Sequence, residues 1–259
     1  MDDIIKDKYY IDLIGESGEV EELLPFVHTC DCYSFREIFN SGFIAPQYCD
    51  VFNEELSYYF YGRPSYRINN SSCSNLSFYF PVCFIISPEC IDKIKYMYPF
   101  DTGAYKKGFY SNYISNRSVV TDYKLNNSLD FLRKFINFFY NNNKNYYDGK
   151  TNVEIDKVDA MAYEIQSIYA LINSKEQSQT DNRCQTIEIQ MEDKLSIKMG
   201  GIKAIVLPGT IVNSAGVSEY IYDNDIELIT YSLNRSSPCE ITPLIIEKVR
   251  EFYKKKGVI

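Results

Sequence analysis

The residues best suited to chemistry in this chain are a single histidine, two arginines around a Gly-Pro turn, and a glutamate in a late strand. The stretch "PFVHTCDC" holds His28, the only histidine of the chain, and Cys30 and Cys32 follow it closely. A histidine beside two thiols could bind a metal, activate a thiolate, bind a cofactor or simply fill a core.

The H-x-C-x-C spacing fits neither of the two simplest chemistries that it suggests. A structural zinc site usually takes two ligand pairs with about two to four residues between the members, and the sequence shows no second pair. A cysteine nucleophile needs a base and a third, orienting group, and none is evident near His28. We therefore predict no metal site. The common glycine-rich phosphate loops are absent too, which excludes the simplest nucleotide-binding enzymes.

The segment "YFYGRPSYR" places Arg63 between Gly62 and Pro64, so its backbone is expected to lie in a turn. Arg67 follows four residues later. Arginine suits phosphate because its guanidinium donates a forked pair of hydrogen bonds. The alternative is a pair of surface arginines in a tyrosine-rich corner.

In "TIEIQM" (186–191), Glu188 alternates with two isoleucines. On a half-buried strand, Thr186, Glu188 and Gln190 would share one face. Three polar groups on one strand face could line a cleft, and the alternative is an ordinary solvated face.

The hydrophobic pattern around these residues predicts one α+β domain over residues 1–259. An acidic extension (1–24) precedes it, with a strand at Tyr9–Leu13, and a helical extension (233–259) ends it. A strand ends at His28, and a capping box, Ser34-x-x-Glu37, opens a helix that Gly42 closes. The other predicted helices span 53–60, 128–140, 157–172, 217–225 and 242–257, and the other strands span 76–87, 186–191, 202–208 and 226–233. Residues 98–110 and 141–152 are predicted turns and loops.

The charge balance and the N-terminus limit the class of protein further. A net charge of −8 argues against binding nucleic acid through a broad basic face, although a local basic cleft is compatible with it. The charged start "MDDIIKDKYY" lacks the apolar segment of a secretory signal, and no run reaches the length of a membrane span. We therefore expect a cytoplasmic protein, with no membrane partner and mostly reduced cysteines.

Taken in order, the strand ending in "HT", the short helix closing at a glycine, the arginine in "YFYGRPSYR" and the glutamate in "TIEIQ" form a pattern. This pattern resembles the ADP-ribosyltransferase superfamily, and most nearly the DarT-type toxins and their relatives, over residues 25–210. The resemblance implies a split, mostly antiparallel β-sheet core with flanking short helices. It also implies NAD as co-substrate.

The resemblance assigns roles to particular residues. His28 and Thr29 would bind NAD, with His28 donating to a hydroxyl of the adenosine ribose. Arg63 would act near the scissile half of NAD, with Arg67 beside it, and Glu188 would be catalytic. Tyr61 or Tyr66 would stack on the nicotinamide. The cysteines near His28 would then be buried packing residues.

The resemblance leaves the acceptor open. Many protein-modifying members carry Glu or Gln two residues before the catalytic Glu, where this chain has Thr186. DarT-like enzymes act on DNA, whereas this chain is acidic. We therefore expect ADP-ribose transfer to nucleic acid or protein by a toxin or anti-phage effector, with an antitoxin or other regulatory partner. The alternatives are an NAD glycohydrolase on the same fold, a non-catalytic nucleotide- or partner-binding module, and an α+β domain with chance similarities.

Overall fold

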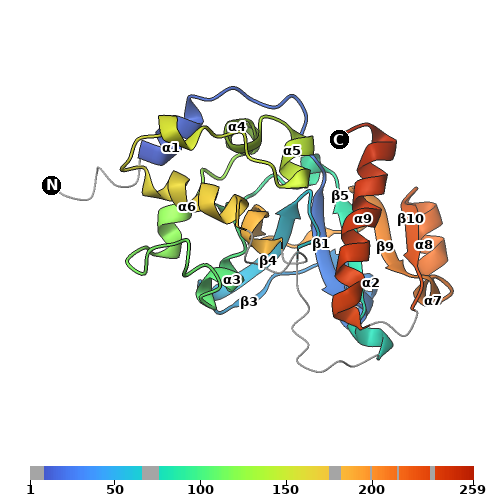
Figure 1. Cartoon of the computed structure of the whole chain (residues 1–259). Helices are drawn as coiled ribbons and strands as arrows, with labels where there is room; N and C mark the ends of the chain where they lie inside the picture. Colours follow the sequence, from blue (N-terminus) through green and yellow to red (C-terminus); the bar gives the residue numbers. More distant parts are fainter. Residues whose placement is uncertain (1–8, 66–75, 175–181, 199, 215, 234–236) are drawn as a thin grey trace. The chain divides into compact units, whose positions relative to one another are not determined.

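The computed structural model describes residues 9–65, 76–174, 182–198, 200–214, 216–233 and 237–259. The chain divides into two compact units. The first comprises Met1–Leu24, Ile94–Gln190 and Val258–Ile259, and the second comprises Pro25–Lys93 and Met191–Gly257. Both contain helices and strands, and most strand pairs are antiparallel, which confirms the predicted α+β class (Figure 1).

The second unit is built on a sheet with the strand order β10-β9-β5-β1-β4, and β3 also pairs with β4. Only β9 and β10 run parallel among these pairs. The central strand β5 is buried along its whole length, which explains its continuous apolar sequence "PVCFII". The strands are β1 Phe26–Asp31, β3 Gln47–Cys49, β4 Glu54–Tyr61, β5 Pro81–Ile86, β9 Ile202–Pro208 and β10 Glu227–Tyr231.

The second unit also contains helices that pack against this sheet, and a separate two-stranded sheet, β2-β8. The terminal helix α9 contacts β5 and β9 (Figure 1). Tyr253 Oη, on this helix, donates to Pro25 O over 3.2 Å. This helix starts earlier than predicted and contains Pro243. The remaining elements are α2 Cys32–Ser41, β2 Phe43–Ile44, η1 Ser77–Tyr79, η2 Pro88–Cys90, β8 Leu195–Ser196, α7 Gly209–Val212, α8 Val217–Asp223 and α9 Pro238–Lys256.

Helix α2 follows β1 directly, and this fixes its cap. The side chain of Asp31, the last residue of β1, accepts from Ser34 N over 2.7 Å. The predicted capping box at Ser34 and Glu37 is therefore wrong, because the helix has already begun at Cys32. The predicted closure at Gly42 is confirmed by its left-handed backbone (φ 78°).

The first unit gathers most of its helices around a short antiparallel pair, β6 and β7. Tyr98 lies opposite Glu188 and Tyr96 opposite Gln190. The helix predicted over 128–140 is confirmed as α4, which buries Phe131, Phe135 and Phe139, whereas Phe138 is only half-buried. The elements are α1 Tyr9–Gly15, β6 Tyr96–Tyr98, α3 Thr102–Lys106, η3 Val120–Tyr123, α4 Leu129–Tyr140, α5 Asn143–Asp148, η4 Ile155–Lys157, α6 Tyr163–Ile172, η5 Arg183–Gln185 and β7 Glu188–Met191.

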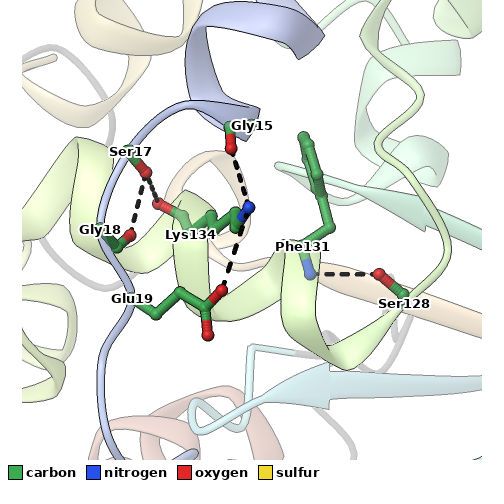
Figure 2. Close-up of polar contacts among 7 residues, drawn as sticks. All are labelled: Gly15, Ser17, Gly18, Glu19, Ser128, Phe131 and Lys134. Carbon is green, nitrogen blue, oxygen red and sulfur yellow. Dashed lines mark hydrogen bonds and ion pairs between the residues drawn. The ribbon is translucent and has the colours of Figure 1, made fainter.

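The N-terminal extension is joined to α4 by polar contacts. Figure 2 shows Lys134 Nζ donating to Gly15 O (2.8 Å) and facing Glu19, while Ser17 Oγ donates to Lys134 O (3.0 Å). The predicted strand at Tyr9–Leu13 is wrong. This segment is the helix α1, which contacts α4 and buries Tyr10 and Ile14, four residues apart on one helix face.

Four other predicted segments differ from the structure. Residues 53–60, predicted as a helix, form most of the strand β4, whose aromatic run suits a pleated, buried surface. The predicted loop 141–152 contains α5, which Asn142 caps, and 98–110 contains α3. The helix predicted over 157–172 begins only at Tyr163. The local sequence pattern did not predict these elements, because helix caps and strand pairing determine them.

The close approach of β9 to η2 gives a test of this fold. A Cβ added to Gly201 would overlap Sγ of Cys90, while Gly201 O accepts from Ser87 N over 2.8 Å. We expect Gly201→Ala to lower the free energy of unfolding by about 1–3 kcal/mol through overpacking. We expect Cys90→Ala to restore most of that loss in the double variant. Urea unfolding of the two single variants and the double variant measures this. Strictly additive losses would contradict the packing.

Candidate active site

His28 lies in the buried strand β1, between two aromatic rings. Its ring centroid is 5.8 Å from that of Tyr59 and 6.3 Å from that of Phe84. Its Nδ1 lies 2.8 Å from the carbonyl oxygen of Tyr58. Because a carbonyl can only accept, Nδ1 carries the proton and Nε2 is the acceptor of the neutral ring. Burial lowers the pKa of His28 from its usual 6.5, despite the bond to Tyr58, so the ring is neutral near pH 7.

This tautomer reverses the direction of the hydrogen bond expected from the resemblance. We expected His28 to donate to a ribose hydroxyl, but the neutral ring has already committed its N–H to Tyr58. Nε2 can only accept, so a ribose hydroxyl would have to donate to it. A ribose hydroxyl can donate as well as accept, so it could still form a hydrogen bond with Nε2 of His28.

Thr29 does not share a strand face with His28. The pairing of β1 with β5 is regular, with His28 opposite Phe84 and Thr29 opposite Cys83, so the two side chains point to opposite faces. Thr29 is buried. The structure therefore does not bring these two side chains together on one ligand.

Arg63 follows β4 in a tight turn of the second unit. Gly62 has a left-handed backbone (φ 63°), its N–H donates to Pro25 O (3.1 Å), and Ser65 N donates to Arg63 O (2.9 Å). Arg63 is only 2% exposed, so the alternative of a surface arginine is wrong at this position. Tyr66 and Arg67 lie outside the described residues.

Tyr61 and His28 lie on the same sheet as this turn. Tyr61 is fully buried and packs edge-on against Phe26 at 5.6 Å, so its ring is a packing element rather than an open surface for nicotinamide. Tyr61 pairs with Phe26, which places His28 level with Tyr59. Arg63 lies beyond the end of β4, after the chain has turned at Gly62.

Glu188 stands at the start of β7 in the first unit, inside a closed hydrogen-bonded cluster. Its Oε1 accepts from Thr102 Oγ1 (2.7 Å) and from the side-chain amide of Gln190. Its Oε2 accepts from the backbone N–H of Thr102 (3.2 Å). The amide of Gln190 also lies 3.2 Å from Thr102 Oγ1. We call Glu188, Thr102 and Gln190 the carboxyl cluster.

Burial controls the ionisation of this cluster. Glu188 is 2% exposed, and its pKa is raised from 4.5 to about 8. Its removal from water is the largest cause and the nearby carboxylate of Asp101 adds to it, while the hydrogen bonds from Thr102 and Gln190 lower the pKa. Glu188 is therefore mostly uncharged at pH 7. Carboxyl groups held neutral in this way are common at functional sites.

The expected polar face of β7 exists, but it is closed. Thr186, Glu188 and Gln190 are all buried, so neither an open cleft nor a solvated face describes them. Thr186 Oγ1 donates to Asn182 O over 2.7 Å and is committed to that turn. Thr102, at the first turn of α3, reaches Glu188 across 86 residues of sequence. The sequence carried one hint of this, the distinctive "PFDTGAY" segment that contains Thr102.

The cysteines near His28 have the properties of packing residues. Cys30 and Cys32 are buried, and burial raises the pKa of Cys30 well above 9 and that of Cys32 to about 12. A nucleophilic thiol needs the opposite shift. Within the described ranges, no group of three or more His, Cys, Asp or Glu side chains is placed to hold a metal ion.

The predicted site residues therefore fall into two groups. His28, Tyr61 and Arg63 lie along β1 and β4 of the second unit, and Glu188 belongs to the carboxyl cluster of the first unit. Sequence reasoning missed Thr102 and did not assign a role to Gln190. Comparisons of the chain with protein-family models, curated proteins and solved structures found no match. Among the described helices, none is long and apolar enough to cross a membrane.

The raised pKa of Glu188 predicts a specific dependence of stability on pH. Between pH 4.5 and about 8 the folded protein holds a proton at Glu188 that the unfolded chain releases, so stability falls as the pH rises through this interval. We expect Glu188→Gln to abolish this fall. At pH 9 its free energy of unfolding should exceed that of the wild type by on the order of 3 kcal/mol. Denaturant unfolding from pH 4 to 9 measures it. Glu154→Gln, an exposed control, should follow the wild type, and parallel curves for all three proteins would contradict the assignment.

The lone histidine makes its ionisation directly measurable. We expect one imidazole signal in an NMR titration, with a pKa below 6.5 and the shifts of the Nδ1-protonated tautomer. A pKa at or above 6.5, or an Nε2-protonated neutral ring, would contradict the geometry described for His28.

Proposed function

We propose that this protein is an NAD-dependent ADP-ribosyltransferase. The observation that carries the proposal is the carboxyl cluster, because the residue that the resemblance makes catalytic is a buried glutamate with a shifted pKa and matched hydrogen-bond donors. The α+β class and the mostly antiparallel sheet are compatible with an ADP-ribosyltransferase-like fold, which remains part of the proposal.

The chemistry proposed for Glu188 is charge stabilisation. The bond between nicotinamide and ribose C1 breaks, its electron pair leaves with nicotinamide, and the sugar becomes oxocarbenium-like. An ionised Glu188 beside the ribose stabilises that positive charge and takes the proton of the attacking acceptor hydroxyl or amine. The acceptor then holds ADP-ribose through a new bond to C1. The reaction thus requires Glu188 in its charged form.

The second unit supplies the groups proposed to bind NAD. His28 Nε2 can accept from a ribose hydroxyl, and the packing of its ring between Tyr59 and Phe84 fixes its direction. Arg63 would supply a guanidinium suited to a pyrophosphate; the turn holds its backbone, and the residue itself is buried.

The acceptor is proposed to be a macromolecule, and one segment favours nucleic acid over protein. Between Thr102 and Thr121 the sequence has three basic residues and no acidic one, within a chain of net charge −8. Lys106 and Lys107 are exposed there, and Phe109 is 51% exposed beneath the guanidinium of Arg183, at 5.1 Å. Cations beside an exposed ring suit a single-stranded nucleic acid. A toxin or anti-phage role with a regulatory partner follows from the resemblance alone.

A second candidate is an NAD glycohydrolase, in which water is the acceptor. One observation favours it. Thr186, two residues before Glu188, is buried and bonded to Asn182 O, so it cannot select a macromolecular acceptor as Glu or Gln does at that position in many relatives.

The test follows the label of NAD radiolabelled in its adenylate phosphate. The purified protein is incubated with lysate, the product is treated with nuclease or with protease, and Glu188→Gln and Glu154→Gln are run in parallel. We expect label on a nuclease-sensitive macromolecule, a rate lowered about 100-fold or more by Glu188→Gln, and no effect of Glu154→Gln. Glu154 lies in the same unit with 69% of its side chain exposed.

The other outcomes separate the alternatives. Release of free ADP-ribose alone identifies the glycohydrolase. Equal activity of Glu188→Gln and the wild type would contradict the assigned catalytic residue. Binding of NAD without turnover under any lysate condition would support a non-catalytic nucleotide-binding module. Absence of NAD binding would contradict the assignment of NAD as co-substrate.

A further inference from the structure

The carboxyl cluster leaves Glu188 without an oxygen that a substrate can reach. Oε1 is occupied by the hydroxyl of Thr102 and the amide of Gln190, and Oε2 by the N–H of Thr102. Glu188 is 2% exposed, and Thr102 and Gln190 are fully buried. Thr102 supplies both a side-chain and a main-chain donor, so one residue occupies both oxygens.

The chain around Thr102 is firmly anchored. We call residues 99–106 the covering segment. Phe100, within it, packs against Tyr105, Tyr110 and Tyr123 with ring centroids 5.3–5.8 Å apart. This aromatic packing anchors the chain two residues before Thr102.

Polar contacts fix the same segment on both sides of Thr102. Asp101 accepts from Ala104 N (2.6 Å) and its own N–H donates to Arg183 O (3.0 Å). Tyr105 Oη donates to Ser118 O (2.7 Å). The covering segment is thus a built element whose contacts favour the closed arrangement.

The closed arrangement conflicts with the chemistry proposed for Glu188. A carboxylate that stabilises an oxocarbenium-like sugar must be charged and must touch the ribose. In the cluster it is largely neutral at pH 7, and Thr102 stands where a ribose hydroxyl would have to bond. Withdrawal of Thr102 would free both oxygens and admit water, which favours the charged form.

We propose that residues 99–106 form an autoinhibitory cover, in which Thr102 occupies the carboxyl of Glu188 in the resting protein and must withdraw before NAD can react. This inference rests on the proposed ADP-ribosyltransferase function and concerns the regulation of the same site. A ligand opens the cover only if it binds the open state more tightly than the closed one. NAD itself meets that condition, because its ribose replaces Thr102 at Glu188.

Two substitutions of Thr102 separate the contact from the fold. Thr102→Val keeps the shape but removes the hydroxyl, whereas Thr102→Ser keeps the hydroxyl and serves as the matched control. Losing one net hydrogen bond of the closed state should raise kcat/KM for NAD about tenfold in Thr102→Val, while Thr102→Ser stays close to the wild type. Thermal unfolding of both variants checks that the fold is retained.

Hydrogen exchange of the wild-type protein gives an independent measure. The peptide carrying residues 99–106 should be protected in the free protein, because Thr102 N–H is bonded to a buried carboxyl. We expect saturating NAD to increase exchange in this peptide. The peptide carrying residues 129–140 of α4 serves as the internal control and should not change.

The outcomes distinguish this proposal from the proposed function. Faster exchange with NAD together with a more active Thr102→Val supports the cover, as does activity in Thr102→Val when the wild type has none. Turnover by the wild type with unchanged exchange and no gain in Thr102→Val overturns the cover and leaves the function intact. If no variant binds NAD or turns it over, the proposed function is overturned, and the proposed cover is overturned with it.

Discussion

The structure depends most on the cost of burying a carboxyl group at Glu188. A carboxylate removed from water is stable only if donors surround it or if it takes up a proton, and the carboxyl cluster shows both responses. Thr102 and Gln190 supply the donors, and the raised pKa supplies the proton at neutral pH. Proteins retain such an arrangement either because a network specifies the fold or because the group does chemistry. The order of His28, Arg63 and Glu188 in the sequence leads us to the second explanation.

The two units differ in how they hold their buried polar groups. The second unit is a sheet whose central strands are almost wholly apolar, so its few polar groups, His28 at β1 and Arg63 after β4, are held by main-chain bonds and by neighbouring rings. The first unit combines a short strand pair with α3 and an aromatic cluster around Phe100. The second unit thus holds directional polar groups, and the first unit holds an ionisable group.

Local sequence determined some of these elements but not others. The helix α4, the left-handed Gly42 and the strand β9 follow from side-chain period and turn chemistry, and the sequence predicts them. The strand β4 was missed because its pairing with β1, which is distant in the sequence, and its hairpin pairing with β3 override its helical appearance. Glu188 could be singled out by its alternation with isoleucines. The contact of Thr102 with Glu188 could not be predicted, because it spans 86 residues and no local pattern links the two positions.

The most direct test of the central claim is a 13C NMR titration of the Glu188 carboxyl, assigned by comparison with Glu188→Gln, in the absence and presence of NAD. We expect the Glu188 carboxyl to titrate near pH 8 in the free protein. With NAD bound we expect a lower pKa, because the ribose replaces Thr102 and favours the charged form. A carboxyl that titrates near pH 4.5, or one whose titration NAD leaves unchanged, would contradict it.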